Sequence, residues 1–239
     1  MIEIFNRYEL VKELGKGATS HVYLAWDKLL SRKTAVKTGY NEELFLREAR
    51  CLSEYVKPCF PVLYDYAKEE NCAYLFMEYV EGENLKERFA RTGGYTEKEV
   101  IYIACQAAQA IQFLHTGKTP YVYGDIKLEN IMVQRDGSVK LVDFGTLCPL
   151  AEPVGGSVLR GGTPRYAPPD MWMGHADIRS DIYALGKLML FLIQISGRKS
   201  MGANAERIIE RCTQKQKEAR YQSMEQVISA LNACLAEPS

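Results

Sequence analysis

The chain has 239 residues, of which 47% are hydrophobic and 25% charged, a composition typical of a globular protein with a sizeable core. Its 30 basic and 30 acidic residues cancel, which argues against nucleic acid or an anionic membrane surface as a partner. The seven cysteines are dispersed and form no C-x-x-C pair, which argues against a disulfide framework or a zinc site and favours a reducing cytoplasm.

The N-terminal third of the chain carries strand patterns. Apolar and polar positions alternate over residues 8–40, which predicts an antiparallel sheet with strands at 8–14, 22–26 and 33–38. Further strands are expected at about 61–66 and 73–79. A glycine-containing turn over residues 15–20 could bring backbone N–H groups close to phosphate oxygens. Taken alone, such a turn is more often a plain hairpin.

Helical patterns dominate the rest of the chain. Residues 42–56 are expected to form a helix with Asn41 as its N-cap, and Glu48 could point inward toward Lys37. The apolar positions of this helix that should face the core are Phe45, Ala49, Leu52 and Val56. A capping box at Thr96 predicts a helix to about His115. Further helices are expected at 181–195, 204–212 and 224–236.

A short segment supplies the chemistry. One predicted strand–turn–strand region, at 122–143, contains Asp125, Lys127, Asn130 and Asp143. These side chains are the groups needed to orient a hydroxyl, to neutralise a phosphate and to hold Mg²⁺. A β-rich third followed by a helical remainder predicts an α+β fold with two lobes.

Taken in chain order, the motifs resemble those of the eukaryotic-type protein serine/threonine kinase family, in the compact form found in bacteria. The resemblance runs from about Tyr8 to Leu235. The matching segments are Gly15-Lys16-Gly17-Ala18-Thr19-Ser20 for the glycine-rich loop, Ala35-Val36-Lys37 for the lysine strand, Glu48 for its partner, residues 77–80 for the hinge, Asp125, Lys127 and Asn130 for the catalytic loop, Asp143-Phe144-Gly145 for D-F-G, residues 162–169 for the segment ending in A-P-E, residues 180–186 for a buried helix, and Arg220.

The resemblance implies a fold and a set of roles. It implies one protein-kinase domain over residues 1–239, with an N-lobe at about 1–78, a C-lobe at about 82–239 and an ATP site in the cleft between them. Asp125 would accept the proton of a Ser or Thr hydroxyl, and Lys127 would offset charge on the γ-phosphate. Asn130 and Asp143 would bind Mg²⁺, with Mn²⁺ as an alternative ion. The remaining ATP-binding positions would be Gly15, Lys16, Gly17, Ser20, Val22, Ala35, Lys37, Glu48, Met77, Glu78, Tyr79, Val80 and Met132, and Thr146 and Thr163 would lie in the activation segment.

Three departures from the family pattern stand out. Tyr123-Gly124-Asp125 replaces H-R-D, which removes the Arg that would bind a phosphorylated activation loop, so we expect activity without that phosphorylation. Tyr123 is expected to pack against Phe144. Pro169 replaces the Glu of A-P-E, and Asp170 is the candidate to pair with Arg220 instead. The chain is also shortened between residues 195 and 205, where the family usually has another helix.

Two other functions remain open at this point. The altered loop also fits a pseudokinase that binds nucleotide or a partner without turnover. A small-molecule phosphotransferase is the third reading, because the loop of antibiotic kinases also has Gly before Asp. We expect a cytoplasmic monomer or weak dimer that acts on protein substrates, without nucleic acid or membrane partners.

Overall fold

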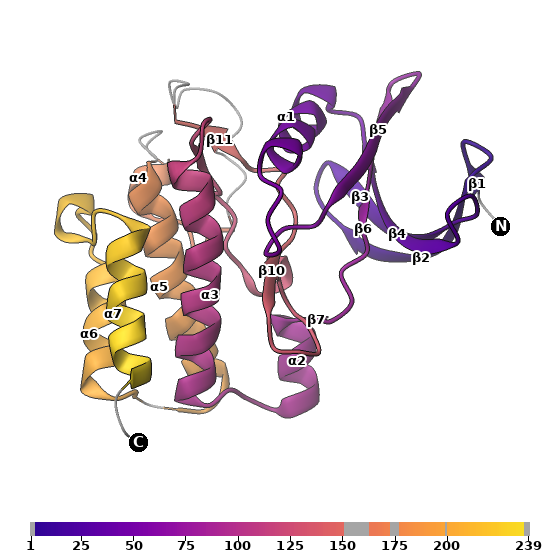
Figure 1. Cartoon of the computed structure of the whole chain (residues 1–239). Coiled ribbons are helices and arrows are strands. Elements are labelled where there is room, and N and C mark those ends of the chain that lie inside the picture. The colour runs from indigo at the N-terminus through magenta and orange to yellow at the C-terminus, as the bar shows by residue number, and fades with distance from the viewer. Residues whose placement is uncertain (1–2, 151–162, 173–176, 199, 237–239) are drawn as a thin grey trace. The chain divides into compact units, whose positions relative to one another are not determined.

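The computed structural model describes residues 3–150, 163–172, 177–198 and 200–236 (Figure 1). The chain divides into two compact units, Met1–Glu81 and Gly82–Ser239. The first unit is mostly sheet and the second mostly helix, so the fold is α+β as expected.

An antiparallel sheet forms the N-terminal unit. Its spatial order is β1-β2-β3-β4-β6-β5. The strands are β1 (Glu3–Ile4), β2 (Tyr8–Lys16), β3 (Ser20–Asp27), β4 (Arg32–Gly39), β5 (Leu63–Glu69) and β6 (Cys72–Glu78). All five predicted strands are confirmed. Most of them are a few residues longer than the pattern indicated, because ladder pairing continues into residues such as Gly15 and Lys16, which face Val22 and His21.

One helix, α1 (Glu42–Glu54), packs on this sheet. Asn41 caps it as predicted, since its side chain accepts a hydrogen bond from the Leu44 N–H. Phe45 and Ala49 are buried against Leu75 and Met77 of the sheet. The prediction that Val56 faces the core is wrong: α1 ends at Glu54, and Val56 is 71% exposed.

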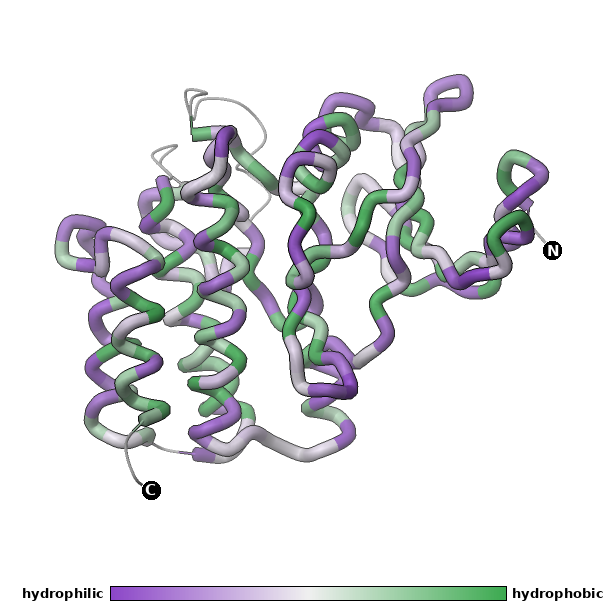
Figure 2. Tube along the Cα trace, viewed as in Figure 1, coloured by the Kyte–Doolittle hydropathy of each residue, from purple (hydrophilic) through white to green (hydrophobic). Residues whose placement is uncertain are grey.

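The C-terminal unit is built on helices. These are α2 (Leu85–Thr92), α3 (Glu97–Thr116), α4 (Pro169–Trp172), α5 (Ile178–Ile195), α6 (Ala203–Cys212) and α7 (Met224–Ala236), with short 3₁₀ turns η1 (Leu128–Asn130) and η3 (Lys217–Ala219). Figure 2 shows hydrophobic and hydrophilic residues interleaved along them, as expected of helices with buried and exposed faces. None of the helices in the described ranges is long and apolar enough to cross a bilayer.

The predicted helix boundaries are confirmed closely. Thr96 forms the expected capping box and opens α3. The helix α5 starts three residues before the expected position, because Asp177 accepts the Arg179 N–H at 2.8 Å and its own N–H is bonded to Ser180. A polar cap residue that precedes the apolar run therefore extends the helix beyond the apolar pattern.

Two small sheets complete this unit and carry the motif residues. β9 (Ile131–Val133) pairs antiparallel with both β10 (Val139–Leu141) and β7 (Glu83–Asn84). β8 (Tyr121–Val122) pairs with β11 (Cys148–Pro149). These sheets place the segments before Asp125 and after Asp143 side by side.

Candidate active site

Asp125 is the centre of the polar cluster in the C-terminal unit. Its side chain is buried, and both of its carboxylate oxygens accept hydrogen bonds. Oδ1 accepts the Thr163 hydroxyl at 3.0 Å. Oδ2 accepts the Asn130 amide at 3.0 Å and also pairs with the Lys127 ammonium. The carboxylate is therefore held in one orientation by three predicted site residues.

Asn130 and Asp143 lie at the same end of the β9–β10 hairpin. Leu141 pairs with Ile131, and the Val142 N–H donates to the Asn130 carbonyl at 2.9 Å, so the two residues flank the last rung of the ladder. Asn130 uses its Nδ2 to bond the Asp125 carbonyl at 2.9 Å, which leaves its side-chain oxygen as the atom suited to a cation.

The donor set at this hairpin fits Mg²⁺. An amide oxygen of Asn130 and a carboxylate of Asp143 are hard oxygen ligands, and Mg²⁺ commonly takes one or two such side chains and keeps several waters. Asp143 has a positive φ of 66°, in the left-handed region, and its Oδ1 accepts the Gly145 N–H at 3.2 Å. Asp tolerates this conformation better than most residues do. These two residues would hold the ion.

Tyr123 links the catalytic loop to the D-F-G segment. Its hydroxyl donates to the Val142 carbonyl at 2.6 Å. Its ring meets the Phe144 ring edge-on, with centroids 5.6 Å apart, which confirms the predicted packing. An aromatic residue therefore holds the residue before Asp143 and the residue after it.

Asp181 holds the backbone of the catalytic loop, a contact that the sequence did not predict. It is fully buried at the start of α5, and it accepts the backbone N–H groups of Tyr123 at 2.8 Å and Gly124 at 2.9 Å. His115 of α3 lies 2.8 Å from the same carboxylate and is also buried. The available signal was an Asp directly before the apolar run of residues 182–193, since carboxylates are almost never fully buried without partners.

Thr163 is the first described residue of the activation segment after residue 150. Residues 151–162, including Gly162 of the A-P-E-like motif, lie outside the described residues. Thr163 contacts Asp125, and the next aromatic residue, Tyr166, packs edge-on against Phe191. Burial raises the pKa of Tyr166 to about 12, with the Glu129 carboxylate acting in the same direction, so the phenol stays neutral.

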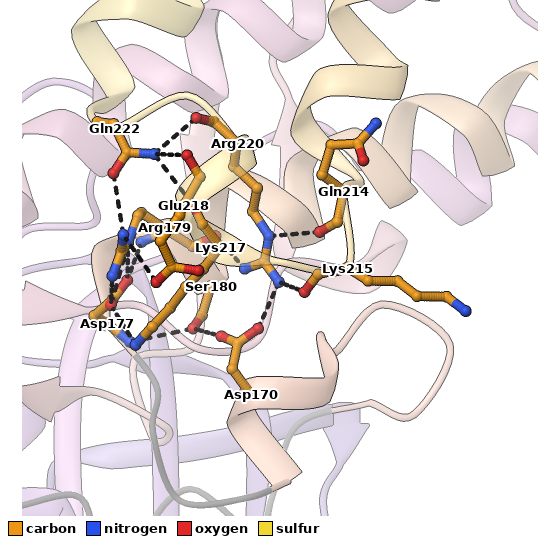
Figure 3. A network of polar contacts seen from close by, with 10 residues as sticks. All are labelled: Asp170, Asp177, Arg179, Ser180, Gln214, Lys215, Lys217, Glu218, Arg220 and Gln222. Carbon is orange, nitrogen blue, oxygen red and sulfur yellow. Dashed lines mark hydrogen bonds and ion pairs between the residues drawn. The ribbon is translucent and has the colours of Figure 1, made fainter.

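Asp170 pairs with Arg220, as predicted (Figure 3). Arg220 Nη2 donates to Asp170 Oδ1 at 2.5 Å, and the Ser180 hydroxyl donates to Asp170 Oδ2 at 2.8 Å. Pro169 is exposed, whereas Asp170 and Arg220 are 7% and 1% exposed. The first turn of α4 thus directs residue 170, and not residue 169, toward the arginine.

In the N-terminal unit, Lys37 and Glu48 form a buried ion pair. Lys37 Nζ lies 2.6 Å from Glu48 Oε2, and the two residues are 4% and 1% exposed. Lys37 sits in β4 and Glu48 in α1, so the packing of α1 on the sheet brings them together. The expectation that Glu48 points inward toward Lys37 is confirmed.

Most of the other predicted nucleotide positions lie on the strands of the same sheet. Gly17 lies in the turn between β2 and β3, and its N–H donates to Ser20 O at 2.8 Å, so this amide closes the turn. The Glu78 N–H is likewise bonded to Val62 O at 2.8 Å. Positions on strands are Gly15 and Lys16 on β2, Ser20 and Val22 on β3, Ala35 on β4, and Met77 and Glu78 on β6, with Tyr79 and Val80 following; Met132 lies on β9 of the C-terminal unit.

Comparison with known proteins agrees with the motifs. The protein kinase domain model matches residues 8–237. The chain is 35% identical to the serine/threonine-protein kinase PrkC of Bacillus subtilis over 202 residues, covering 80% of this chain and 31% of that protein. It is 35% identical to PknB of Mycobacterium tuberculosis over 198 residues, covering 76% and 31%. A probable serine/threonine-protein kinase of Clostridium acetobutylicum is 30% identical over 266 residues, covering 95% and 40%. The chain thus spans about a third of the length of these relatives.

Proposed function

Because the chain belongs to the protein kinase family, we propose that it transfers the γ-phosphoryl group of ATP to Ser or Thr hydroxyls of proteins. The observation that carries this proposal is the fixed carboxylate of Asp125, bonded by Lys127, Asn130 and Thr163. Such preorganisation is what phosphoryl transfer requires, since the reaction depends on positioning and charge neutralisation more than on covalent help.

In the proposed reaction, the substrate hydroxyl oxygen forms a bond to the γ-phosphorus while the bond from that phosphorus to the β,γ-bridging oxygen breaks. Asp125 orients the hydroxyl and accepts its proton, and ADP leaves with the bridging oxygen. Lys127, which pairs with Asp125, would offset charge on the transferred group. Asn130 and Asp143 would hold Mg²⁺, which would supply charge neutralisation on the phosphates.

Lys37 is proposed to bind the α- and β-phosphates of ATP. Its ion pair with Glu48 holds the flexible lysine stem in a fixed position, which lowers the entropy lost when a phosphate binds. The Gly15–Ser20 turn would bring backbone N–H groups close to the phosphates. Val22 and Ala35 would pack on the adenine, and the hinge residues 77–80 would bond its edge. The Glu78 N–H is occupied by Val62, so this residue would offer its carbonyl to the base.

We further propose that activity does not require phosphorylation of the activation segment. Gly124 stands where the family places an Arg, and a glycine offers no guanidinium to a phosphate. Tyr123 and Gly124 are instead held by Asp181 through their N–H groups.

The seven free thiols suit a reducing compartment, which supports a cytoplasmic site of action.

A single assay tests the reaction and its phosphorylation state. The full chain and an Asp125→Asn variant are treated with a phosphatase, which is then removed, and are incubated with labelled ATP, generic protein substrates and either Mg²⁺ or EDTA. The proposal is supported if Ser or Thr residues are labelled only when the wild-type protein is incubated with Mg²⁺, and not with EDTA or with Asp125→Asn. Label that persists in Asp125→Asn would contradict the role of Asp125, and activity only before phosphatase treatment would contradict phosphorylation independence.

A further inference from the structure

The peptide that precedes Asp125 is held from two sides. On one side, Asp181 of α5 accepts the N–H groups of Tyr123 and Gly124. On the other side, the Tyr123 carbonyl accepts the Thr146 hydroxyl at 2.9 Å. Thr146 directly follows D-F-G, so this bond joins the catalytic loop to the start of the activation segment.

Thr146 is well placed to act as a fixed donor. The Leu147 N–H donates to the Phe144 carbonyl at 3.3 Å, which closes a turn around Gly145 and Thr146. Immediately afterwards, Cys148 of β11 pairs with Val122 of β8. Thr146 therefore lies between a closed turn and a strand ladder, which fix the position of its hydroxyl. The residue is half-buried.

The glycine at position 124 permits this close approach. Gly124 has a φ of +81°, and a Cβ at this position would lie 3.1 Å from the Thr146 carbonyl oxygen. A side chain at 124 would be strained by the left-handed backbone and would press on the Thr146 backbone. Gly124 therefore has two effects: it stands where the family has the phosphate-binding Arg, and it lets the Thr146 segment come close to the loop.

We propose that Thr146 is a positioning residue. Its hydroxyl holds the catalytic loop to the activation segment in place of an Arg–phosphate contact. Its bond to Tyr123 fixes the carbonyl side of the peptide leading to Gly124 and Asp125. The inference rests on the proposed phosphorylation-independent activity, because it names the contact that substitutes for the phosphate.

The test compares Thr146→Val, which keeps the shape and loses the hydroxyl, with Thr146→Ser, which keeps the hydroxyl. Loss of one neutral hydrogen bond at this loop is expected to lower kcat about threefold to tenfold in Thr146→Val, with KM for ATP within about twofold of wild type. Thr146→Ser should retain kcat near the wild-type value. Thr213→Val is the matched control, because Thr213 also donates its hydroxyl to a backbone carbonyl, that of Ile209 at 2.8 Å. The control should leave kcat unchanged.

All proteins are assayed after phosphatase treatment, and their folding is checked by thermal melting. Equal kcat in the wild type, Thr146→Val and Thr146→Ser would overturn the proposal, and so would an equal loss in both variants. If the dephosphorylated wild type is inactive, phosphorylation independence fails, and the statement that Thr146 replaces a phosphate contact fails with it. The positioning role is then tested on untreated proteins: a loss in Thr146→Val that Thr146→Ser restores supports it, and equal rates overturn it.

Discussion

Arg220 donates to Asp170 at 2.5 Å across 50 residues of sequence, in a place where the family motif offers a glutamate one residue earlier. Arg220 also donates to the carbonyls of Gln214, Arg179 and Lys215, at 2.8, 3.0 and 3.1 Å. The guanidinium is fully buried, and its charge is matched by a single carboxylate in the network of Figure 3. Displacing the acid by one position thus preserves the pair.

Asp170→Asn should destabilise the C-terminal unit by about 3 kcal/mol, because it leaves the Arg220 charge buried without a counter-ion. The carbonyl contacts to Arg220 remain, which keeps the loss near the lower end of the usual range for such pairs. Urea unfolding of the full chain measures the effect. Glu218→Gln is the control, since Glu218 lies 3.7 Å from Arg179 and is exposed. Its free energy of unfolding should change by less than about 1 kcal/mol, and an equal loss in both variants would contradict the role of Asp170.

Asp177 should give the fold a dependence on acid pH. Burial acts to raise the pKa of this carboxyl, but hydrogen bonds from Arg179 and Lys217 outweigh it and hold the pKa at about 2. A depressed folded-state pKa contributes stability that is complete above the unfolded-state value of 3.8 and is lost as pH falls toward 2. The contribution is about 2 kcal/mol, and roughly half of it is gone by pH 3.

Asp177→Asn isolates this charge, because asparagine is also a good N-cap and can still accept the Arg179 N–H. The stability difference between wild type and variant should be largest at pH 6 and should shrink as pH falls from 4 to 2.5. Urea titrations at these pH values measure it. A difference that stays constant with pH would show that Asp177 is not the titrating group.

Gly124→Ala should lower stability and activity together. An alanine at φ +81° costs about 1–2 kcal/mol in backbone strain, and its Cβ would press on the Thr146 carbonyl. Gly137→Ala is the control: Gly137 has a φ of +84° in the β9–β10 turn, and no atom lies within 4 Å of an added Cβ. Both variants should melt at lower temperature, whereas only Gly124→Ala should lose kcat. An equal kcat in the two variants would remove the link between Gly124 and the catalytic loop.

Lys37→Met should reduce phosphotransfer by at least about 100-fold, because it removes the proposed phosphate ligand and the cation that pairs with the buried Glu48. Glu48→Gln should weaken activity less, since the ammonium remains. Lys28→Met is the control, because Lys28 forms an exposed pair with Glu3 on the same unit. Initial rates with labelled ATP distinguish the three. Wild-type activity in Lys37→Met would rule out the proposed role of Lys37.

Local patterns in the sequence determined the elements and the motif set. The capping residues Asn41 and Thr96 and the spacing of apolar side chains depend on neighbours within one or two turns, so the starts of α1 and α3 could be predicted directly. The start of α5 was expected three residues too late, and at Val56 the apolar spacing continued past the true end of α1 at Glu54. Nothing in the local pattern marked that end: the Tyr55 N–H still bonds to the Cys51 carbonyl, but the backbone of Tyr55 leaves the helical region with a φ of −104° and a ψ of 67°.

The tertiary structure decided how the motif residues are held. Asp181 reaches the loop across 57 and 58 residues, and Thr146 reaches Tyr123 across 23. Such contacts depend on where whole helices and strands pack, which sequence spacing does not encode. The sequence by itself therefore determined which groups could carry out phosphoryl transfer, since motif chemistry is written in residue types. Packing decided that Asp181 accepts the Tyr123 and Gly124 N–H groups, and that Gly124 admits the Thr146 segment.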